Sequence, residues 1–283
     1  MDLIADTNVW YDIGAGTRDP TVLKSGGDRL ITTPTSFLEI ASGIDDRTFP
    51  DRKAAAQGVV SHADDVAEDC ESHLARLWGL NVPSLPINWI EGFRAIAQAG
   101  SPAELDLGVK DFGPRVVRTV KVSVAEQWRT YHWNDFRDQV VLALDQHIPG
   151  YASARARGRS KQLNKEDAKI FAEAMKSGYV RQSVLRSTFL RALLVVGQDP
   201  RAPTKEEEQT AEPLLSAYID AYIEYVIGCA SEFAPQPNDL GDSECFLYLQ
   251  DDRRFLSSDV RWVRIARRAC PSRIHDPENK VPE

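Results

Sequence analysis

Short apolar runs near the two ends of the chain, separated by a long stretch of helical pattern, are the feature that most restricts the fold. Residues 3–5 and 30–32 form two such runs near the N-terminus, and residues 255–257 form a third near the C-terminus. Apolar runs of this length between polar residues are typical of strands buried on both faces of a parallel sheet. We therefore expect the two ends of the chain to share one α/β sheet.

Apolar residues at helical spacing fill most of the chain between about residues 50 and 235. Asn164 and Thr204 precede two of the predicted helices and are suited to cap them. The pattern predicts an α/β domain made of residues 1–48 and 236–283, interrupted by an all-helical insertion of residues 49–235. A long insertion is tolerable because the cost of closing a loop grows slowly with its length. The predicted helices are residues 52–78, 86–99, 124–146, 165–177, 180–196 and 204–233.

The C-terminal part of the chain returns to alternating strands and helices. Residues 242–250 and 260–269 have the spacing of two helices on either side of the last apolar run, and residues 273–275 suit an edge strand. Near the N-terminus, a helix is expected to begin at Pro34, with Glu39 in its first turn. Both ends of the chain thus have the pattern of an α/β domain.

Charge is distributed unevenly along the chain, whose formal net charge is −8. Residues 1–113 carry −9, residues 114–200 carry +7 and residues 201–283 carry −6. An acidic protein can still bind a polyanion if its positive charge is gathered on one surface, because binding depends on local contacts with phosphates. Solvated helix faces explain the same charges equally well. Charge alone therefore neither requires nor excludes a nucleic-acid partner.

Several protein classes lack support in the sequence. The N-terminal residues MDLIADTN have neither the basic start nor the long apolar stretch of a signal peptide, and no apolar run is long enough to span a membrane. The four cysteines are scattered, and neither a His-Glu-x-x-His motif nor a Gly-rich phosphate loop is present. We expect a cytoplasmic protein without a membrane partner, and neither a zinc hydrolase nor a nucleotide-driven motor.

Four acidic residues stand where the predicted strands end or the predicted helices begin. Asp6 follows the first apolar run, and Glu39 lies near the start of the helix after the second run. Asp242 opens the penultimate helix, and Asp259 follows the last run. These positions converge on the crevice where open α/β sheets bind ligands, and oxygen-only ligands suit Mg²⁺ or Mn²⁺ better than zinc. Asp239, three residues before Asp242, is an alternative third acid or a shared ligand.

At these acids the sequence resembles the PIN-domain family of Mg²⁺- or Mn²⁺-dependent nucleases. Residues 4–8 (IADTN) look like the first strand and first metal-binding aspartate of that family. Residues 35–40 (TSFLEI) are similar to the helix that carries its second acid. Residues 238–242 (NDLGD) and 255–259 (FLSSD) resemble the segments that supply its third and fourth acids.

The resemblance covers about residues 1–48 and 236–275. It implies a three-layer α/β/α PIN-like fold with a short parallel sheet, and a metal-dependent endoribonuclease that hydrolyses the phosphodiester bonds of RNA. Ser257 or Ser258 would orient the site by hydrogen bonds. The long helical stretch departs from the small toxins of this family, so the biological role stays open. The implied catalytic residues and ligands of Mg²⁺ or Mn²⁺ are Asp6, Glu39, Asp242 and Asp259, with Asp239 as a further metal ligand.

Two groups of basic residues are candidates for binding the phosphates of a nucleic acid. The first group lies within residues 151–161, where a solvated linker between two helices is an equally good interpretation. The second group lies on the helix after Asp259, where charge complementarity at the end of a helix is the alternative. The candidates in the two groups are Arg155, Arg157, Arg159, Lys161, Arg261 and Arg264.

Three functions are compatible with these patterns. The first is the endoribonuclease, with an RNA substrate and either an inhibitory protein partner of the antitoxin kind or self-association. The second is a PIN-like binding or scaffold module with a degenerate site, and the presence of all four acids argues against it. The third is a metal-dependent phosphohydrolase that acts on a small molecule, which a narrow pocket between the helices would favour.

Overall fold

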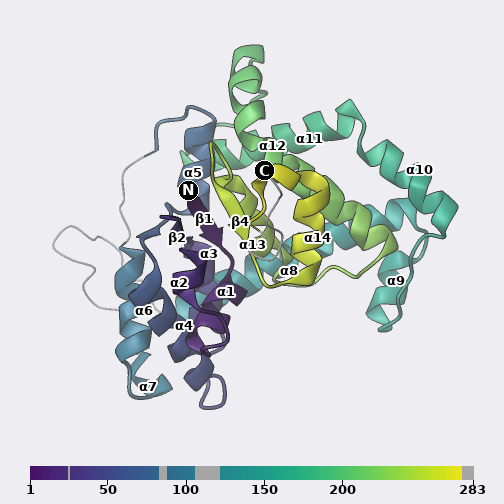
Figure 1. Ribbon diagram of the computed structural model, residues 1–283. Coiled ribbons are helices and arrows are strands. Elements are labelled where there is room, and N and C mark those ends of the chain that lie inside the picture. Colours follow the sequence, from purple (N-terminus) through teal and green to yellow (C-terminus); the bar gives the residue numbers. More distant parts are fainter. Residues whose placement is uncertain (25, 83–87, 106–121, 276–283) are drawn as a thin grey trace.

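A four-stranded parallel sheet joins the two ends of the chain. The computed structural model describes residues 1–24, 26–82, 88–105 and 122–275. The strand order is β3-β2-β1-β4, so β1 pairs with an N-terminal strand on one side and with a C-terminal strand on the other. The predicted α/β class and the pairing of the two ends are therefore observed (Figure 1). The strands are β1 (Asp2–Ala5), β2 (Arg29–Thr32), β3 (Asp65–Val66) and β4 (Arg254–Leu256).

Hydrophobic core covers both faces of this sheet. In the central strand, Ile4 lies opposite Ile31 of β2 and Phe255 of β4, and these three residues share one buried cluster. The flanking residues Leu3 and Ala5 belong to a second cluster. Successive side chains of a strand point to opposite faces, so one cluster lies on each face. Burial on both faces explains why residues 3–5, 30–31 and 255–256 are apolar at successive positions.

A strand interrupts residues 52–78, for which the sequence pattern predicted one helix. Helix α4 (Phe49–His62) ends before β3, and helix α5 (Cys70–Leu77) begins after it. The N–H of Asp64 donates to the carbonyl of Leu30 at 2.8 Å, and the carboxylate of Asp64 accepts from the N–H of Leu30 at 2.8 Å. These long-range bonds to the sheet outweigh the local helical periodicity. The prediction of one helix is wrong, and residues 49–235, predicted as an all-helical insertion, contain the strand β3.

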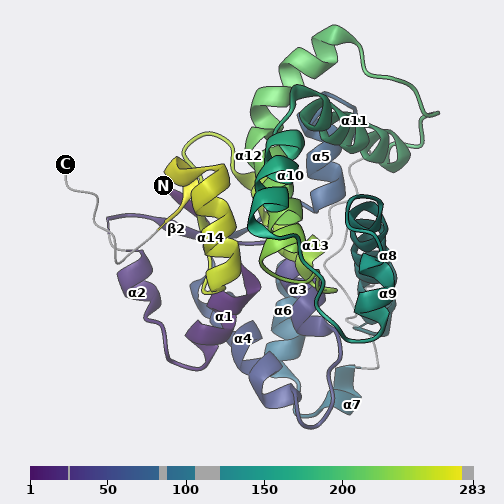
Figure 2. The same ribbon diagram turned by 90° about the vertical axis from the view of Figure 1, so that its right-hand side faces the viewer.

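Helices near the N-terminus cover the face of the sheet that carries Leu3. Residues of α1, α3, α4 and α6 fill the cluster on this face. At the crossing of α1 and α4, a Cβ added to Gly14 would lie 2.5 Å from the carbonyl carbon of Ala54, so glycine permits this close approach. In Figures 1 and 2, α4, α6 and α7 lie together, away from α10 (Lys165–Met175) and α11 (Gly178–Val195). The remaining bounds are α1 (Thr7–Gly14), α2 (Pro20–Leu23), α3 (Pro34–Ala41), α6 (Trp89–Gln98) and α7 (Pro102–Leu105).

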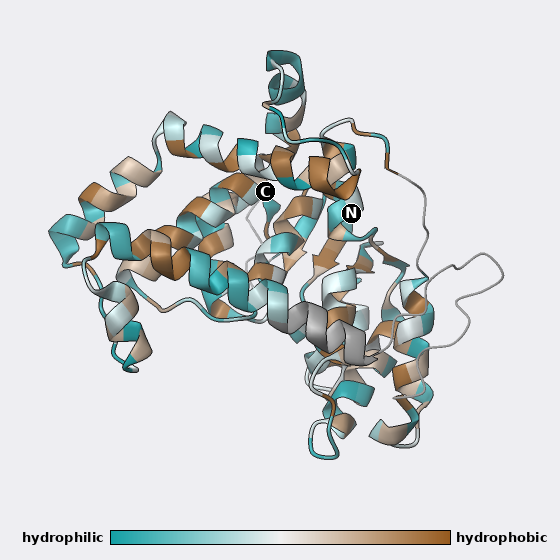
Figure 3. Ribbon diagram, turned by 180° about the vertical axis from the view of Figure 1, so that it is seen from behind, coloured by the Kyte–Doolittle hydropathy of each residue, from teal (hydrophilic) through white to brown (hydrophobic). Residues whose placement is uncertain are grey.

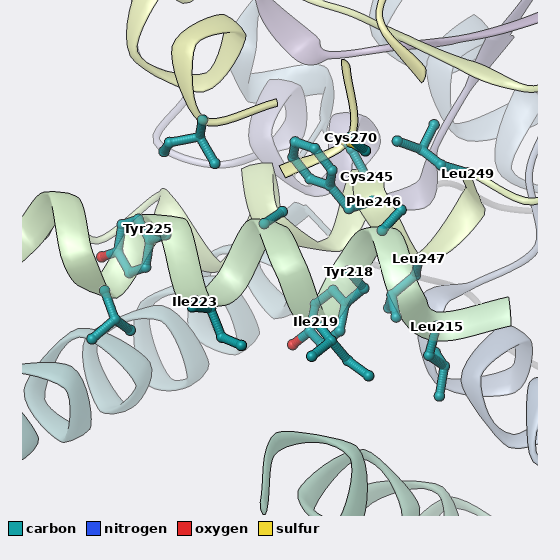
Figure 4. Packing of buried hydrophobic residues seen from close by; sticks show 14 of the residues in the cluster. Leu215, Tyr218, Ile219, Ile223, Tyr225, Cys245, Phe246, Leu247, Leu249 and Cys270 are labelled. Atoms are coloured by element: carbon teal, nitrogen blue, oxygen red, sulfur yellow. The ribbon is translucent and has the colours of Figure 1, made fainter. Parts of the chain in front are cut away.

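The other face of the sheet is covered mainly by α12 (Lys205–Ser231) and by the segment that follows it. Buried residues of α12 and of residues 245–249 form one cluster, which Figure 4 shows at close range. Tyr225 of α12 stacks on Trp262 at a ring separation of 5.5 Å and so joins α12 to α14. The other elements are α8 (Val122–His147), α9 (Tyr151–Ala156), α10 (Lys165–Met175), α11 (Gly178–Val195), α13 (Asp239–Glu244), η1 (Cys245–Tyr248), α14 (Val260–Ala269) and η2 (Pro271–Arg273).

The helices of the middle of the chain agree closely with the sequence pattern. Helices α8, α10, α11 and α12 begin and end within two residues of the predicted bounds, and α6 occupies the described part of the helix predicted over residues 86–99. The side chain of Asn164 accepts from two N–H groups at the start of α10. Thr204 forms a capping box with Glu207 at the start of α12. Both predicted caps are therefore confirmed.

Three shorter segments differ from their predictions. Residues 151–161, interpreted from sequence as a loop or linker, begin with the short helix α9. Residues 242–250 contain the end of α13 and the 3-10 helix η1 in place of one α-helix. The edge strand predicted at residues 273–275 is reduced to one parallel bridge between Ile274 and Phe255. In each case the segment is too short for periodicity to determine its structure.

Many of the helices are amphipathic. Figure 3 shows hydrophobic and hydrophilic residues along the long helices at the back of the molecule. Helices with this pattern cover a core with one side and meet water with the other. Within the described ranges, no helix has the length and apolarity needed to cross a membrane.

Candidate metal centre

Asp6 lies between the first strand and the first helix. It follows β1, is the N-cap residue of α1 and is 1% exposed. Its backbone N–H donates to the carbonyl of Leu256 at 2.9 Å, which continues the pairing of β1 with β4. Its carboxylate Oδ2 accepts from Ser257 Oγ at 2.7 Å and from Asn8 Nδ2 at 3.1 Å. These bonds fix the orientation of the Asp6 carboxylate.

Glu39 projects from α3, whose start is determined by local sequence. The N-cap Thr33 accepts from the N–H of Ser36, and Pro34 occupies the first turn, where its missing N–H costs nothing. The helix therefore begins at Pro34 as predicted, but Glu39 is its sixth residue and lies in the second turn. The prediction of Glu39 in the first turn is wrong. The Glu39 side chain is buried, at 8% exposure.

Asp242 lies in the first turn of α13 and is 6% exposed. The preceding Gly241 allows α13 to approach α3. A Cβ at residue 241 would lie 2.8 Å from Thr35 Cγ2 and 3.3 Å from Glu39 Oε1. Both separations are too short for a larger side chain without a shift of the neighbours. The glycine therefore brings the carboxylates of Glu39 and Asp242 together.

Three of the four predicted acids converge. One carboxylate oxygen from each of Asp6, Glu39 and Asp242 lies within 4.8 Å of the other two. We call these three residues the acid triad. Glu39 and Asp242 open onto a pocket of about 890 Å³, whose wall also contains Asn8, Asp259 and Arg261. Three elements that are distant in sequence thus build one acidic site.

Asp259, the fourth predicted acid, lies in the wall of the pocket but outside the 4.8 Å group. It is the N-cap of α14, and its Oδ1 accepts from the N–H groups of Arg261 at 2.7 Å and Trp262 at 3.4 Å. Its own N–H donates to Ser257 Oγ at 3.0 Å, and Ser257 donates in turn to Asp6. Ser257, one of the two serines predicted to orient the site, therefore links Asp259 to the triad.

Asp239, the predicted alternative to Asp242, is also outside the acid triad. It is fully buried, and its Oδ2 accepts from Tyr225 Oη at 2.7 Å and from the N–H of Gln236 at 2.6 Å. Its Oδ1 lies 2.6 Å from Arg261 Nη2. Tyr225 and Gln236 thus donate to Oδ2 of Asp239 and the guanidinium of Arg261 lies beside Oδ1, whereas Asp242 faces the other acids.

The electrostatics of the triad favour the uptake of protons or a cation. Burial raises the pKa of Asp6, and the hydrogen bonds from Ser257 and Asn8 offset this only in part. Burial, together with the negative charges of Asp6 and Glu39, raises the pKa of Asp242 well above its ordinary value. Buried like charges at this separation cannot all stay ionised unless a positive charge lies among them. The arrangement is therefore suited to hold a cation.

In a second acidic group, a basic side chain of the protein itself neutralises the carboxylates. Cys70, Glu71 and Glu244 also place ligand atoms within 4.8 Å of one another. Arg191 pairs with both of these glutamates, and its Nε lies 2.9 Å from Glu71 Oε1. In the acid triad, by contrast, the guanidinium of Arg261 lies 3.8 Å from Asp242, and no described residue forms an ion pair with Asp6. The chemistry of the donor oxygens therefore fits Mg²⁺ or Mn²⁺ at the triad.

The predicted phosphate-binding residues lie in different environments. Arg155 donates to the carbonyl of Pro235 at 2.9 Å, and Lys161 donates to the carbonyl of Pro149. Arg157 and Arg159 are exposed on the same segment. On α14, Arg264 pairs with Glu232 at 3.1 Å. Of these candidates and Arg261, the wall of the large pocket contains Arg261 alone.

Sequence reasoning missed the residues that support the site from other helices. Tyr225 in α12 holds Asp239, and Arg52 in α4 donates to the backbone carbonyl of Glu39. Tyr225 and Arg52 carry no motif, and neither residue is close to its partner along the chain. Only the packing of the helices brings Arg52 to the pocket and Tyr225 to Asp239.

Searches among known protein families, curated proteins and solved structures found no match to this chain. The assignment of a function therefore depends on the chemistry of the pocket.

Proposed function

We propose that the chain is a metal-dependent endoribonuclease whose α/β part is a three-layer PIN-like domain. The observation that carries the proposal is the convergence of three buried carboxylates, Asp6, Glu39 and Asp242, within 4.8 Å beside a large pocket. Core on both faces of the short parallel sheet supports the three-layer arrangement. The resemblance of the residues around these acids to PIN nucleases supports the same assignment.

The acid triad would hold Mg²⁺ or Mn²⁺, with Asp259 at its edge. When bound, such a cation polarises a phosphodiester and lowers the pKa of the attacking water. The hydrogen bonds from Ser257 and Asn8 hold the Asp6 carboxylate in one orientation before a ligand arrives. Supporting bonds of this kind raise metal affinity because less reorganisation is needed on binding.

The basic segment 155–161 would bind the RNA backbone next to the pocket. Arg155 donates to the carbonyl of Pro235, and the next residue along the chain, Gln236, lines the pocket. Arg157 and Arg159 are exposed on this segment and form no ion pair within the described chain that a phosphate would have to replace. Arg264 of α14 would add a contact after leaving Glu232. Such contacts give affinity that depends on salt and little on RNA sequence.

A cleavage assay on labelled single-stranded RNA tests the proposal. We expect cleavage with Mg²⁺ or Mn²⁺ and none with EDTA. Asp6→Asn and Glu39→Gln should each lower the rate by more than about 100-fold, since losing a residue that only supports a metal ligand already costs about 10–100-fold. The matched control is Asp46→Asn, an exposed acid outside the pocket, which should cleave like the wild type.

Two outcomes would contradict the proposal at different points. If Asp6→Asn cleaves as fast as an active wild type, the acid triad is not the active site. If the wild type cleaves no RNA with either metal, the chain is not a ribonuclease.

One observation favours a second candidate, a metal-dependent phosphohydrolase of small molecules. The pocket volume of about 890 Å³ lies within the range of about 300–1,000 Å³ that is common for small-ligand sites. Rates on p-nitrophenyl phosphate and bis(p-nitrophenyl) phosphate separate the two candidates. A nuclease should cleave the diester and leave the monoester intact, whereas a preference for the monoester would favour the phosphohydrolase.

A further inference from the structure

Arg261 places a guanidinium in the wall of the pocket beside the acid triad. It is the second residue of α14, and its side chain is 22% exposed. Its Nη2 lies 2.6 Å from Asp239 Oδ1, but 3.8 Å from Asp242 Oδ2 and 3.8 Å from Asp259 Oδ2. The two longer separations exceed hydrogen-bond lengths. Arg261 is therefore held by Asp239 and only lies near the acids of the candidate metal centre.

Hydrogen bonds from the protein interior fix the orientation of the Asp239 carboxylate. Two donors, Tyr225 Oη and the N–H of Gln236, occupy its Oδ2, so the carboxylate cannot rotate without losing both bonds. The guanidinium of Arg261 also lies 5.4 Å from the ring centre of Phe233 and 5.7 Å from that of Trp262. Aromatic faces favour a cation at this distance. These contacts place the guanidinium in one position before any ligand binds.

The acids approach the guanidinium of Arg261 most closely at one nitrogen. A guanidinium has five N–H donors, and the shortest separation between Arg261 and each of the three acids involves Nη2. Its Nε and Nη1 form no hydrogen bond within the described chain. Because Arg261 lines the pocket, these donors can serve a ligand that enters it.

We propose that Arg261 binds a non-bridging oxygen of a substrate phosphate beside the acid triad, and that Asp239 is the residue that positions Arg261. This inference rests on the proposed nuclease function. A phosphodiester is an anion, and the carboxylates of the pocket repel it. A guanidinium offers paired N–H groups that match the geometry of phosphate oxygens. Asp239 then acts through Arg261 and is not itself a metal ligand.

RNA binding as a function of salt tests the role of Arg261. Fluorescence polarisation of a labelled single-stranded RNA, in EDTA so that no cleavage occurs, gives the dissociation constant at several salt concentrations. Arg261→Gln should weaken binding by about tenfold and reduce the slope of log Kd against log salt by about one. Arg261→Lys should keep most of the slope and recover only part of the affinity, because lysine lacks the planar fork.

The matched control is Arg268→Gln, which removes the same charge from the same helix. Arg268 pairs with Glu232 and does not line the pocket, so its removal should leave the affinity within about twofold of wild type. If Arg261→Gln has the salt slope of the wild type, Arg261 does not bind a phosphate.

Mn²⁺ titration of the RNA-free protein by calorimetry tests the role of Asp239. Asp242→Asn should weaken Mn²⁺ binding by at least tenfold. Asp239→Asn and Arg261→Gln should leave it within about threefold of wild type or tighten it, because neither removes a ligand. In cleavage assays, Asp239→Asn should raise KM more than it lowers kcat, since the guanidinium is misplaced. If Asp239→Asn weakens Mn²⁺ binding as much as Asp242→Asn does, Asp239 is a ligand and the inference is wrong.

The failure of the inference and the failure of the proposed function are distinguishable. A wild type that binds RNA with a slope reduced in Arg261→Gln, but never cleaves it, would refute the nuclease and keep the phosphate contact. A wild type that cleaves RNA while Arg261→Gln keeps the full slope would refute the phosphate contact alone.

Discussion

Asp242→Asn should stabilise the metal-free protein, even though it removes a residue of the candidate site. Asp242 is buried, and one of its carboxylate oxygens lies within 4.8 Å of oxygens of Asp6 and Glu39. At an effective dielectric constant of about 20, the charges of Asp6 and Glu39 each repel the charge of Asp242 by about 3 kcal/mol. The guanidinium of Arg261, 3.8 Å from Asp242, attracts it by about 4 kcal/mol. The net relief is about 2–3 kcal/mol when all three acids are ionised.

The pH dependence of this effect has a definite sign. Burial raises the pKa of Asp6 and, together with the neighbouring acids, that of Asp242 in the folded protein. Above the ordinary carboxyl pKa, the folded state therefore binds more protons than the unfolded state, and wild-type stability falls as pH rises through the raised values. The advantage of Asp242→Asn should be greatest above that window. It should vanish at acid pH, where the triad of the wild type is protonated.

A bound cation should reverse the order of stability. At a free concentration of about 100 times Kd, a ligand of the folded state stabilises it by about 2.7 kcal/mol. The wild type should gain this increment from Mn²⁺, whereas Asp242→Asn, which lacks one ligand, should gain much less.

Denaturant and thermal unfolding in EDTA and in Mn²⁺ measure both effects. For a chain of 283 residues, about 2 kcal/mol corresponds to a shift in Tm of about 3–4 °C. The control Asp46→Asn should follow the wild type under both conditions. Destabilisation of Asp242→Asn in EDTA, or equal stabilisation of both proteins by Mn²⁺, would refute the reasoning.

Three further predictions concern the same site. Mn²⁺ affinity should rise with pH, because protons on Asp6 and Asp242 compete with the cation, and calorimetry in buffers of different ionisation enthalpy should detect proton release. Gly241→Ala should cost about 1–3 kcal/mol in unfolding free energy and weaken Mn²⁺ binding, because the new Cβ meets Thr35 and separates α13 from α3. Ser257→Ala should raise the pKa of Asp6 further by removing a hydrogen bond that lowers it. The pH at which Mn²⁺ binding is half-maximal should then move upward, and no movement would mean that the bond is unimportant.

The sequence predicts those parts of the fold that depend on neighbouring residues. The buried parts of β1, β2 and β4 can be recognised from the sequence, because burial on both faces favours apolar residues at successive positions. Caps such as Asn164 and Thr204 are equally local. The edge strand β3 has no such signal. It consists of Asp65 and Val66, and its pairing with β2 exists only once the sheet has formed.

Local sequence does not distinguish Asp239 from Asp242. Both residues lie in the first turn of α13, so their sequence context is nearly the same. They are distinguished by Tyr225 of α12, which donates to Asp239, and by Gly241, which lets Asp242 approach α3. The surroundings of two acids three residues apart are thus determined by packing between helices, which periodicity does not describe.

Because of the same dependence on packing, the candidate site forms only when distant parts of the chain have folded together. Asp6 and Ser257 are 251 positions apart, yet Ser257 donates to Asp6 and the backbone of Asp6 continues the pairing of β1 with β4. Glu39 and Asp242 reach the site only if α13 lies against α3. A cation bound by these acids would therefore connect the first strand, α3 and the C-terminal part of the chain, and its binding energy would add to the stability of that arrangement. A substitution that weakens the pairing of β1 with β4 should consequently also weaken metal binding.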